Sequence, residues 1–218
     1  MTHDTQPQSL RAAWRGHGRA FAFSIPPLVI VLVLFSLFVG WVEERPGVVL
    51  DDPILKMLPV VDLTWPVFAI IYGGIVAAVA TMARHPAEII LMLRAYTIMV
   101  AIRIAAMYLA PFDPPAGMIT LIDPVAGLGP GGALTRDLFF SGHTATMFLL
   151  ALCAPGRTMR WVFLSLTILL ALFLLLQHVH YAIDVVAAPF FAYGGYRISK
   201  ASRTLPLLSS GGGGGGGS

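Results

Sequence analysis

Charged side chains are scarce in this sequence. They make up 11% of its 218 residues, whereas about a quarter is typical of a soluble domain. Hydrophobic residues make up 57%, and the mean hydropathy is +0.80. This composition excludes an ordinary soluble domain and predicts an integral membrane protein with little mass outside the bilayer.

Cysteine is almost absent as well. The single Cys153 excludes a disulfide within the chain, and its apolar neighbours favour a role in packing. The formal net charge is +3, but the basic residues are scattered at the edges of apolar runs. Membrane topology explains that distribution better than a nucleic-acid partner, which we do not expect.

Six apolar segments are long enough, or nearly so, to cross a bilayer, which takes about 20 residues per helix. They cover residues 21–41, 64–83, 87–110, 139–154, 159–178 and 180–199. The fourth is short, and it reaches full length only if its helix begins before Ser141. We therefore expect an all-α, polytopic protein with a six-helix transmembrane catalytic domain at 21–200. An N-terminal segment, 1–20, precedes it, and a tail with a glycine-linker scar, 201–218, follows it.

Basic and acidic residues separate between the connections of these six segments. The N-terminus, the second and fourth connections and the C-terminus hold Arg11, Arg15, Arg19, Arg84, Arg157, Arg160, Arg197, Lys200 and Arg203. The other connections hold most of the acidic residues. The positive-inside rule then places both termini in the cytoplasm, which six crossings satisfy. His143, His180 and Asp184 all fall on the opposite, exoplasmic or periplasmic, face.

Two short motifs carry the candidate chemistry. In the SGH motif, Ser141-Gly142-His143-Thr144, the glycine lets backbone N–H groups approach an anion, and a helix beginning there adds its positive dipole end. In the HYAID motif, His180 to Asp184, the acid lies four residues after the histidine on one face of a helix and can orient the imidazole. Together they suit phosphoryl transfer without a metal. The alternatives are structural: an interfacial hydrogen-bonded His143, and a His180 that neutralises Asp184.

Charged residues near these motifs have open roles. Arg103 lies inside the outer end of the third segment, where it must form an ion pair or face a wet cavity. Phosphate binding and an ion pair to Asp123 or Asp137 both fit. Arg136 and Asp137 precede the SGH motif, where they could bind phosphate or stabilise the helix start, and Asp137 suits helix capping.

A metal site is the remaining possibility for the histidines. His178 and His180 lie two residues apart, so on a helix they would face different sides. The sequence also lacks a Glu, Asp or Cys set at ligand spacing. We expect no metal and no other cofactor, and we interpret His178 as an interfacial or supporting residue.

Both motifs resemble those of the sphingomyelin synthases and their relatives. Residues 137–144 resemble the motif D-x-x-x-S-G-H-T, and residues 180–185 resemble H-Y-T-x-D-V. Two weaker similarities fall in the same order along the chain. They are Leu58-Pro59 with Asp62, and Arg103 to Tyr108 followed by Pro111 and Pro114-Pro115. The resemblance covers residues 55–200 approximately and implies six spans with an exoplasmic site.

This family is part of the lipid phosphate phosphatase (type 2 phosphatidic acid phosphatase) superfamily. The resemblance implies that His180, held by Asp184, is the nucleophile or base at phosphorus. His143 would protonate the departing alkoxide or work with the acceptor. The candidate substrate-binding residues are Ser141, Gly142, Arg103, Arg136, Asp137 and Tyr108.

The sequence also departs from the family. Thr135-Arg136 stands where the family has Cys-Gly, and Ala182 stands where it has threonine, so donor and acceptor choice can differ. The family's cytoplasmic N-terminal domain is absent. We therefore expect a minimal prokaryotic version in a bacterial inner membrane, with its site facing the periplasm.

The superfamily's phosphatases carry Lys-x6-Arg-Pro and an arginine six residues before the second histidine. Here Leu174 occupies the latter position, and the former motif is missing. A doubly charged phosphomonoester needs that positive charge, so this site suits a singly charged phosphodiester.

The first hypothesis for the function is transfer of phosphocholine or phosphoethanolamine from a glycerophospholipid to ceramide or diacylglycerol. One alternative is a hydrolase, either a lipid phosphatase or a phospholipase C-like enzyme, and another is a non-enzymatic lipid-binding scaffold. The sequence leaves open whether the chain forms a homo-oligomer.

Overall fold

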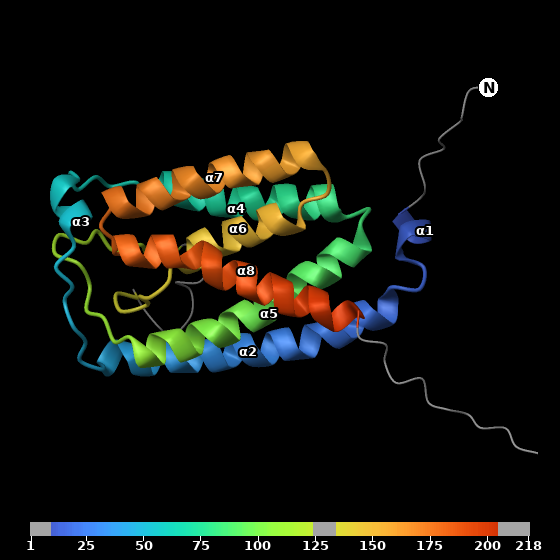
Figure 1. Ribbon diagram of the computed structural model, residues 1–218, viewed down its shortest axis with the longest axis horizontal. Coiled ribbons are helices and arrows are strands. Elements are labelled where there is room, and N and C mark those ends of the chain that lie inside the picture. The colour runs from blue at the N-terminus through green and yellow to red at the C-terminus, as the bar shows by residue number, and fades with distance from the viewer. Residues whose placement is uncertain (1–9, 124–133, 205–218) are drawn as a thin grey trace, which may run out of the picture.

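The computed structural model describes residues 10–123 and 134–204, and their regular elements are helices (Figure 1). These are α1 Leu10–Trp14, α2 Gly18–Glu44, α3 Pro53–Met57, α4 Thr64–Met82, α5 Pro86–Leu109, α6 Gly142–Cys153, α7 Arg157–Leu176 and α8 Ala182–Thr204. The prediction of an all-α protein is confirmed. The glycine-linker tail lies outside the described residues, as do residues 1–9 of the N-terminal segment predicted at 1–20.

Each of the six predicted apolar segments corresponds to one helix, but not all six helices have the length and composition of a span. Within the described residues, α2, α4, α5 and α7 are long and apolar enough to cross a membrane. The apolar helix α6 has 12 residues. The structure therefore supports an integral membrane protein with four candidate spans. Six crossings and their sidedness stay predictions.

The long helices run along one common direction and pack in a bundle (Figure 1). Helix α5 packs against α2 and α8, whereas α7 packs against α4 and α6. Helix α6 also contacts α8 and so joins the two groups. Phe68, Met99, Met147 and Phe163 are among the buried side chains of the common core. Cys153 is also buried there, which confirms its predicted packing role.

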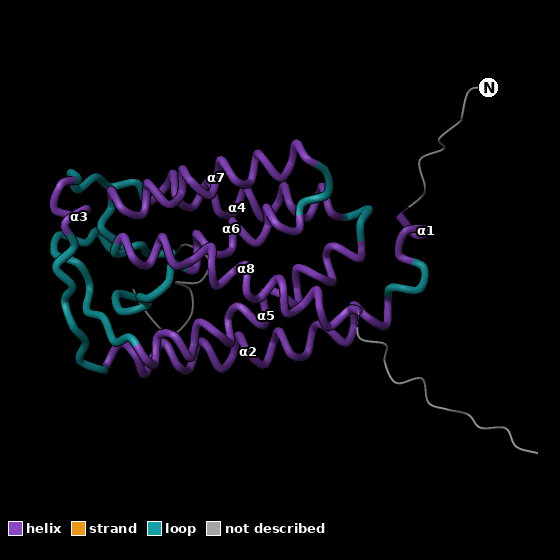
Figure 2. Tube along the Cα trace, viewed as in Figure 1, coloured by secondary structure: helices purple, strands orange, loops and turns teal. Residues whose placement is uncertain are grey.

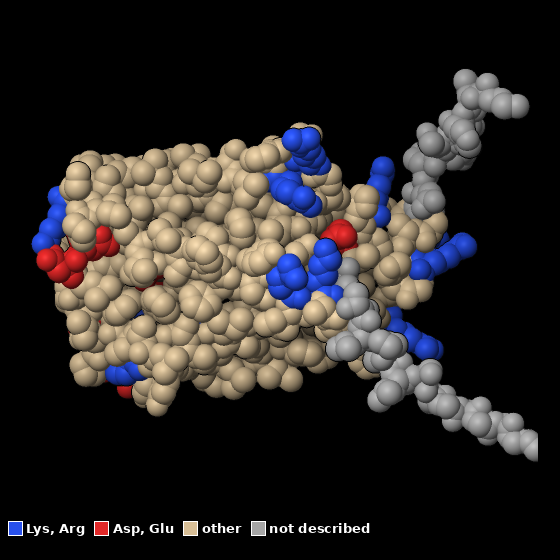
Figure 3. Space-filling model, in the orientation of Figure 1, with Lys and Arg blue, Asp and Glu red and all other residues tan. Residues whose placement is uncertain are grey.

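The two ends of the bundle differ. The first and last described helices, α1 and α8, have their free ends at the same end of the bundle, whereas α3 and the longer loops gather at the other (Figures 1 and 2). Lys and Arg side chains crowd the end with the free termini, and most visible Asp and Glu lie opposite (Figure 3). This separation is the pattern from which we predict cytoplasmic termini.

The expectation that the fourth helix begins before Ser141 is wrong. Phe139 has a φ of 53°, which is outside the right-handed helical region, and Ser141 is extended. The Ser141 hydroxyl oxygen accepts the N–H of Thr144 at 3.3 Å and so caps α6, which begins at Gly142. The SGH motif is therefore the helix start itself, and the apolar residues before it form an extended approach.

Candidate active site

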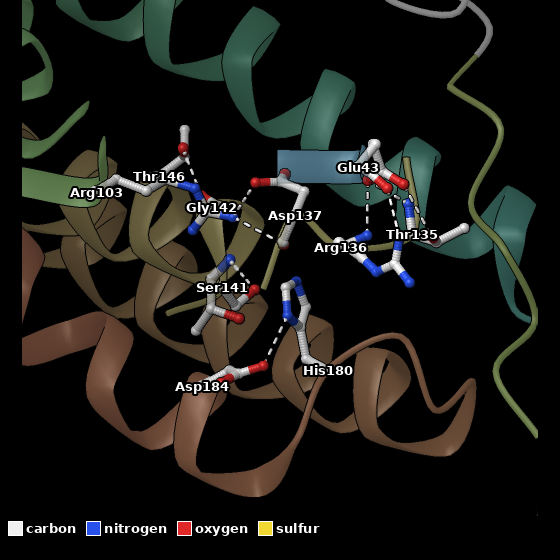
Figure 4. Close-up of polar contacts among 11 residues, drawn as sticks. Glu43, Arg103, Thr135, Arg136, Asp137, Ser141, Gly142, Thr146, His180 and Asp184 are labelled. Atoms are coloured by element: carbon white, nitrogen blue, oxygen red, sulfur yellow. Dashed lines mark hydrogen bonds and ion pairs between the residues drawn. The ribbon is translucent and has the colours of Figure 1, made fainter. Parts of the chain in front are cut away.

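His180 and Asp184 make direct contact at the start of α8. The helix begins at Ala182, so His180 lies in the preceding turn and not on the helix as predicted. Its Nδ1 is 3.2 Å from Oδ2 of Asp184 (Figure 4). The same oxygen accepts the Tyr181 N–H at 3.1 Å. Because this carboxylate oxygen can only accept, it holds a proton on Nδ1 and leaves Nε2 free to act on a substrate. Asp184 is fully buried, and His180 is 3% exposed.

A second aspartate fixes the place where this helix begins. Oδ2 of Asp52 accepts the Ala182 N–H at 2.7 Å. Oδ1 of the same carboxylate accepts the N–H groups of Ile54 and Leu55, at 2.9 and 3.2 Å. Asp52 thus caps α3 and the start of α8 together, which ties the turn that carries His180 to the loop after α2.

The SGH motif is joined to this turn through the backbone. The N–H of Ser141 donates to the carbonyl oxygen of Asp184 at 3.0 Å. His143 lies in the first turn of α6, within electrostatic range of His180, Arg103 and Asp137. The structure therefore brings the two histidine motifs, nearly 40 residues apart in the sequence, to one place beside a helix N-terminus.

Arg103 reaches the same place from α5. Its Nη2 is 2.9 Å from Oδ1 of Asp137 and donates to the carbonyl oxygen of that residue at 3.2 Å. Of the two predicted partners, Asp137 is the one that this ion pair uses. Asp137 does not cap α6, contrary to its predicted capping role, because Ser141 does so. The guanidinium is 3% exposed and lies over the ring of Phe140 at 5.3 Å.

Gly142 allows this arginine to approach the helix start. A Cβ on Gly142 would lie 3.2 Å from Cζ and 3.4 Å from Nη1 of Arg103. The distance to Cζ is tighter than ordinary van der Waals contact, so a residue with a Cβ would push the guanidinium away by a few tenths of an ångström. The glycine thus places a buried positive charge beside the positive end of α6, where an anion is favoured.

Three buried polar atoms near the histidines have no hydrogen-bond partner among the described residues. They are Nη1 of Arg103, Oγ1 of Thr144 and Oδ1 of Asp184. An unpaired buried polar atom costs about 1–3 kcal/mol and is rare in folded proteins. Arg103 Nη1 is a charged donor that an anion can satisfy. The site therefore has the electrostatic features of a phosphate-binding site.

Residues 136–199 match the family model of the PAP2 superfamily C-terminal domain. We call this matched segment the PAP2 domain. It contains both histidine motifs, α7 and most of α8, and members of the superfamily are usually enzymes acting on phosphate esters. The superfamily part of the predicted resemblance is thus confirmed, and the match does not single out the sphingomyelin synthases. No curated protein and no solved structure matches the chain.

Arg136 is the first residue of the PAP2 domain and contacts two acidic residues, Asp113 and Glu43. Its Nε is 2.7 Å from Oδ1 of Asp113, and its Nη1 donates to the carbonyl oxygen of Glu43. The Glu43 carboxylate accepts the N–H of Arg136 at 2.7 Å, the N–H of Thr135 at 2.8 Å and the Thr135 hydroxyl at 2.8 Å (Figure 4). Arg136 therefore anchors the entrance to the PAP2 domain on α2. A phosphate contact of Arg136 stays a prediction.

Tyr108 lies outside the PAP2 domain, on the exposed surface near the end of α5. The residue is 59% exposed, and its ring stacks on Trp41 of α2 at a centroid distance of 6.1 Å. Its carbonyl oxygen accepts from Nη1 of Arg45 at 2.9 Å. The structure brings Ser141, Gly142 and Arg103 to the histidines but stacks Tyr108 on α2.

His178 is not on a helix with His180. It has a φ of 54° and lies in the turn between α7 and α8. In the described ranges, no three His, Cys, Asp or Glu side chains gather as metal ligands would. The sequence argument from helical faces therefore does not apply to this pair.

The sequence reasoning missed Glu43, Asp52 and Asp113, which hold the PAP2 domain in place. Asp52 and Asp113 lie in loops and Glu43 in the last turn of α2, all on the predicted outer side. The only signal for them was that acidic charge, because their partners lie far away along the chain.

Proposed function

We propose that this chain transfers a phospho-headgroup, phosphocholine or phosphoethanolamine, from a glycerophospholipid to ceramide or diacylglycerol. Membership of the PAP2 superfamily supports an enzyme that acts on phosphate esters. The observation that carries the finer proposal is the charge of the site. Among the described residues, the buried arginine beside the histidines is Arg103, and its charge is already paired with the carboxylate of Asp137. Such a site favours a singly charged phosphodiester over a doubly charged phosphomonoester.

The first half of the reaction uses both histidines. Nε2 of His180 attacks phosphorus while the bond from phosphorus to the glycerol oxygen breaks, and the phospho-headgroup moves to His180. The departing diacylglycerol oxygen takes a proton from His143. Asp184 stabilises the positive charge that forms on the His180 ring.

The second half reverses these roles with a new alcohol. The acceptor hydroxyl attacks phosphorus, the bond from phosphorus to Nε2 breaks, and the hydroxyl proton passes to His143. The protonated His143 is then ready for the next turnover. The Nη1 of Arg103 and the positive end of α6 stabilise the negative charge that grows on the phosphoryl oxygens in each transition state.

A hydrolase is the second candidate. The PAP2 match by itself supports phosphatase-type and transferase-type activity equally. If water replaced the lipid alcohol in the second step, the same residues would release a free phospho-headgroup and diacylglycerol.

A lipid assay tests these candidates. Purified protein is incubated with labelled phosphatidylcholine or phosphatidylethanolamine, with and without fluorescent ceramide, and the lipids are then resolved. A labelled phosphosphingolipid that appears only with ceramide supports transfer. Diacylglycerol and free phospho-headgroup, formed regardless of ceramide, would favour the hydrolase. Lipid binding without any product would overturn the transferase and the hydrolase proposals and favour a non-enzymatic lipid-binding scaffold.

A further inference from the structure

A cavity whose lining includes neither His143 nor His180 lies at the end of the bundle that carries α3. Its volume is about 450 Å³, and three stretches line it: residues 49–58, residues 115–116 and the turn with His178 and Tyr181. Leu50, Leu55 and Leu58 supply much of its apolar wall. No step of the proposed reaction uses this cavity.

His178 contributes an unusual polar group to the cavity wall. The residue is 7% exposed, and its Nδ1 lies 3.0 Å from the carbonyl oxygen of Ala116. A carbonyl can only accept, so a neutral His178 ring carries its proton on Nδ1 and leaves Nε2 as an acceptor. In the part of the chain that the structure describes, Nε2 has no partner although it is buried. The cavity therefore offers a hydrogen-bond acceptor to a donor from outside the chain.

The other polar groups of the cavity are mostly engaged. The Tyr181 hydroxyl donates to the carbonyl oxygen of Asp113 at 2.9 Å and accepts the Leu50 N–H at 3.1 Å. Tyr181 is thus part of the wall, and His178 is the side chain left to bind a ligand.

The charge of the lining selects among possible donors. Two acids, Asp51 and Asp52, and one base, Lys56, line the cavity, and Lys56 forms an ion pair with Asp51 at the exposed rim. The acids outnumber the base, so a cation is favoured over an anion or a neutral molecule. A quaternary ammonium has no N–H to give to His178, whereas a primary ammonium has three.

We propose that this cavity binds a primary ammonium group, which donates an N–H to Nε2 of His178 beside the carboxylates of Asp51 and Asp52. The inference deepens the proposed function and rests on it, because it favours phosphoethanolamine over phosphocholine as the transferred headgroup. His178 and Tyr181, which line the cavity, lie in the same turn as the catalytic His180.

Binding can be measured without turnover. Full-length protein labelled with ¹⁵N-histidine, in nanodiscs of phosphatidylcholine, is titrated with ethanolamine, choline or ethylene glycol while the His178 nitrogen signals are followed by NMR. A further arm replaces free ethanolamine with phosphatidylethanolamine in the nanodisc, which separates a free amine from a lipid headgroup. Ethanolamine is expected to shift the Nε2 signal at a concentration about tenfold lower than choline or ethylene glycol.

Two variants test the assignment. His178→Asn keeps an amide donor for Ala116, tolerates the positive φ and removes the Nε2 acceptor. Ala116→Trp fills the cavity and leaves the imidazole in place. Both should weaken ethanolamine binding at least about tenfold, followed for His178→Asn by thermal shift. The matched control His85→Asn removes an exposed histidine elsewhere on the chain and should bind ethanolamine like the parent.

The outcomes separate this proposal from the proposed function. Equal affinity for ethanolamine and choline, or unchanged binding in His178→Asn, would overturn the ammonium site even if the lipid assay showed transfer. Selective ethanolamine binding in a protein that transfers no headgroup would retain the site and overturn the enzyme.

Discussion

The backbone N–H of Ser141 donates to the backbone carbonyl of Asp184 across 3.0 Å. This bond joins the SGH and HYAID motifs without involving a catalytic side chain. The relative position of the two motifs is therefore set by main-chain atoms and by helix caps. It follows that the histidines can be replaced while the site keeps its framework.

His143→Ala and His180→Ala are each expected to lower turnover at least about a thousandfold without unfolding the protein. Each change removes a group that moves a proton or forms a bond at phosphorus. Turnover is measured with the lipid assay and folding by thermal stability. The control His85→Ala removes an exposed histidine away from the site and should keep normal turnover. Near-normal activity in either site variant would defeat the assigned role.

Asp184→Asn tests how the imidazole is held. In the aspartate, one oxygen, Oδ2, contacts both the His180 ring and the Tyr181 N–H, and the amide oxygen of asparagine can take its place. The neutral amide, however, cannot stabilise a positively charged His180 ring as a carboxylate does. We expect turnover to fall by about 10²–10⁴-fold. The fold should persist because the Asp184 backbone carbonyl still accepts from Ser141. A variant with full activity would show that His180 works without its acid.

Gly142→Ala tests the close approach of Arg103. The new Cβ would lie 3.2 Å from Cζ, so the guanidinium must move away from the start of α6. Turnover should fall about tenfold or more, because the phosphate loses a placed donor in the transition state. In Gly194→Ala the Cβ meets nothing within 4 Å, so this matched variant should keep its activity. Equal effects of the two changes would contradict the role of the contact.

Metal removal is expected to leave turnover unchanged. His180 supplies the nucleophile, His143 the acid and Arg103 the positive charge, so the proposed reaction needs no further electrophile. The lipid assay is run before and after dialysis against EDTA. Strong inhibition that added divalent metal reverses would favour a metal-dependent reaction.

The sequence predicted those parts of the site that depend on neighbours along the chain. The contact between His180 and Asp184 spans four residues and follows from their spacing. Ser141 and Gly142 likewise act within the first turn of α6. Local spacing was enough for these residues because capping and i, i+4 contacts are short-range effects.

The missed features depend on contacts between distant segments or on one backbone angle. Glu43 lies 92 residues from Thr135, and Asp52 lies 130 residues from Ala182. Neither contact leaves a periodic signal in the sequence. The start of α6 was set too early because Phe139 and Phe140 are apolar and read as part of a span. The positive φ of Phe139 excludes that helix, and apolarity does not encode it.

Glu43→Gln is expected to destabilise the entrance to the PAP2 domain. One carboxylate oxygen accepts the N–H groups of Thr135 and Arg136 and the other accepts the Thr135 hydroxyl, whereas an amide is neutral and has one acceptor oxygen. We expect about 1–3 kcal/mol lower unfolding free energy, measured by thermal or chemical denaturation in detergent. Turnover should also fall, because Asp137 follows this anchor directly and holds Arg103. The matched control is Glu44→Gln, which makes the same charge change at the adjacent, exposed residue and should leave stability and turnover unchanged. Equal losses of stability and turnover in the two variants would show that net charge at the end of α2 is the cause.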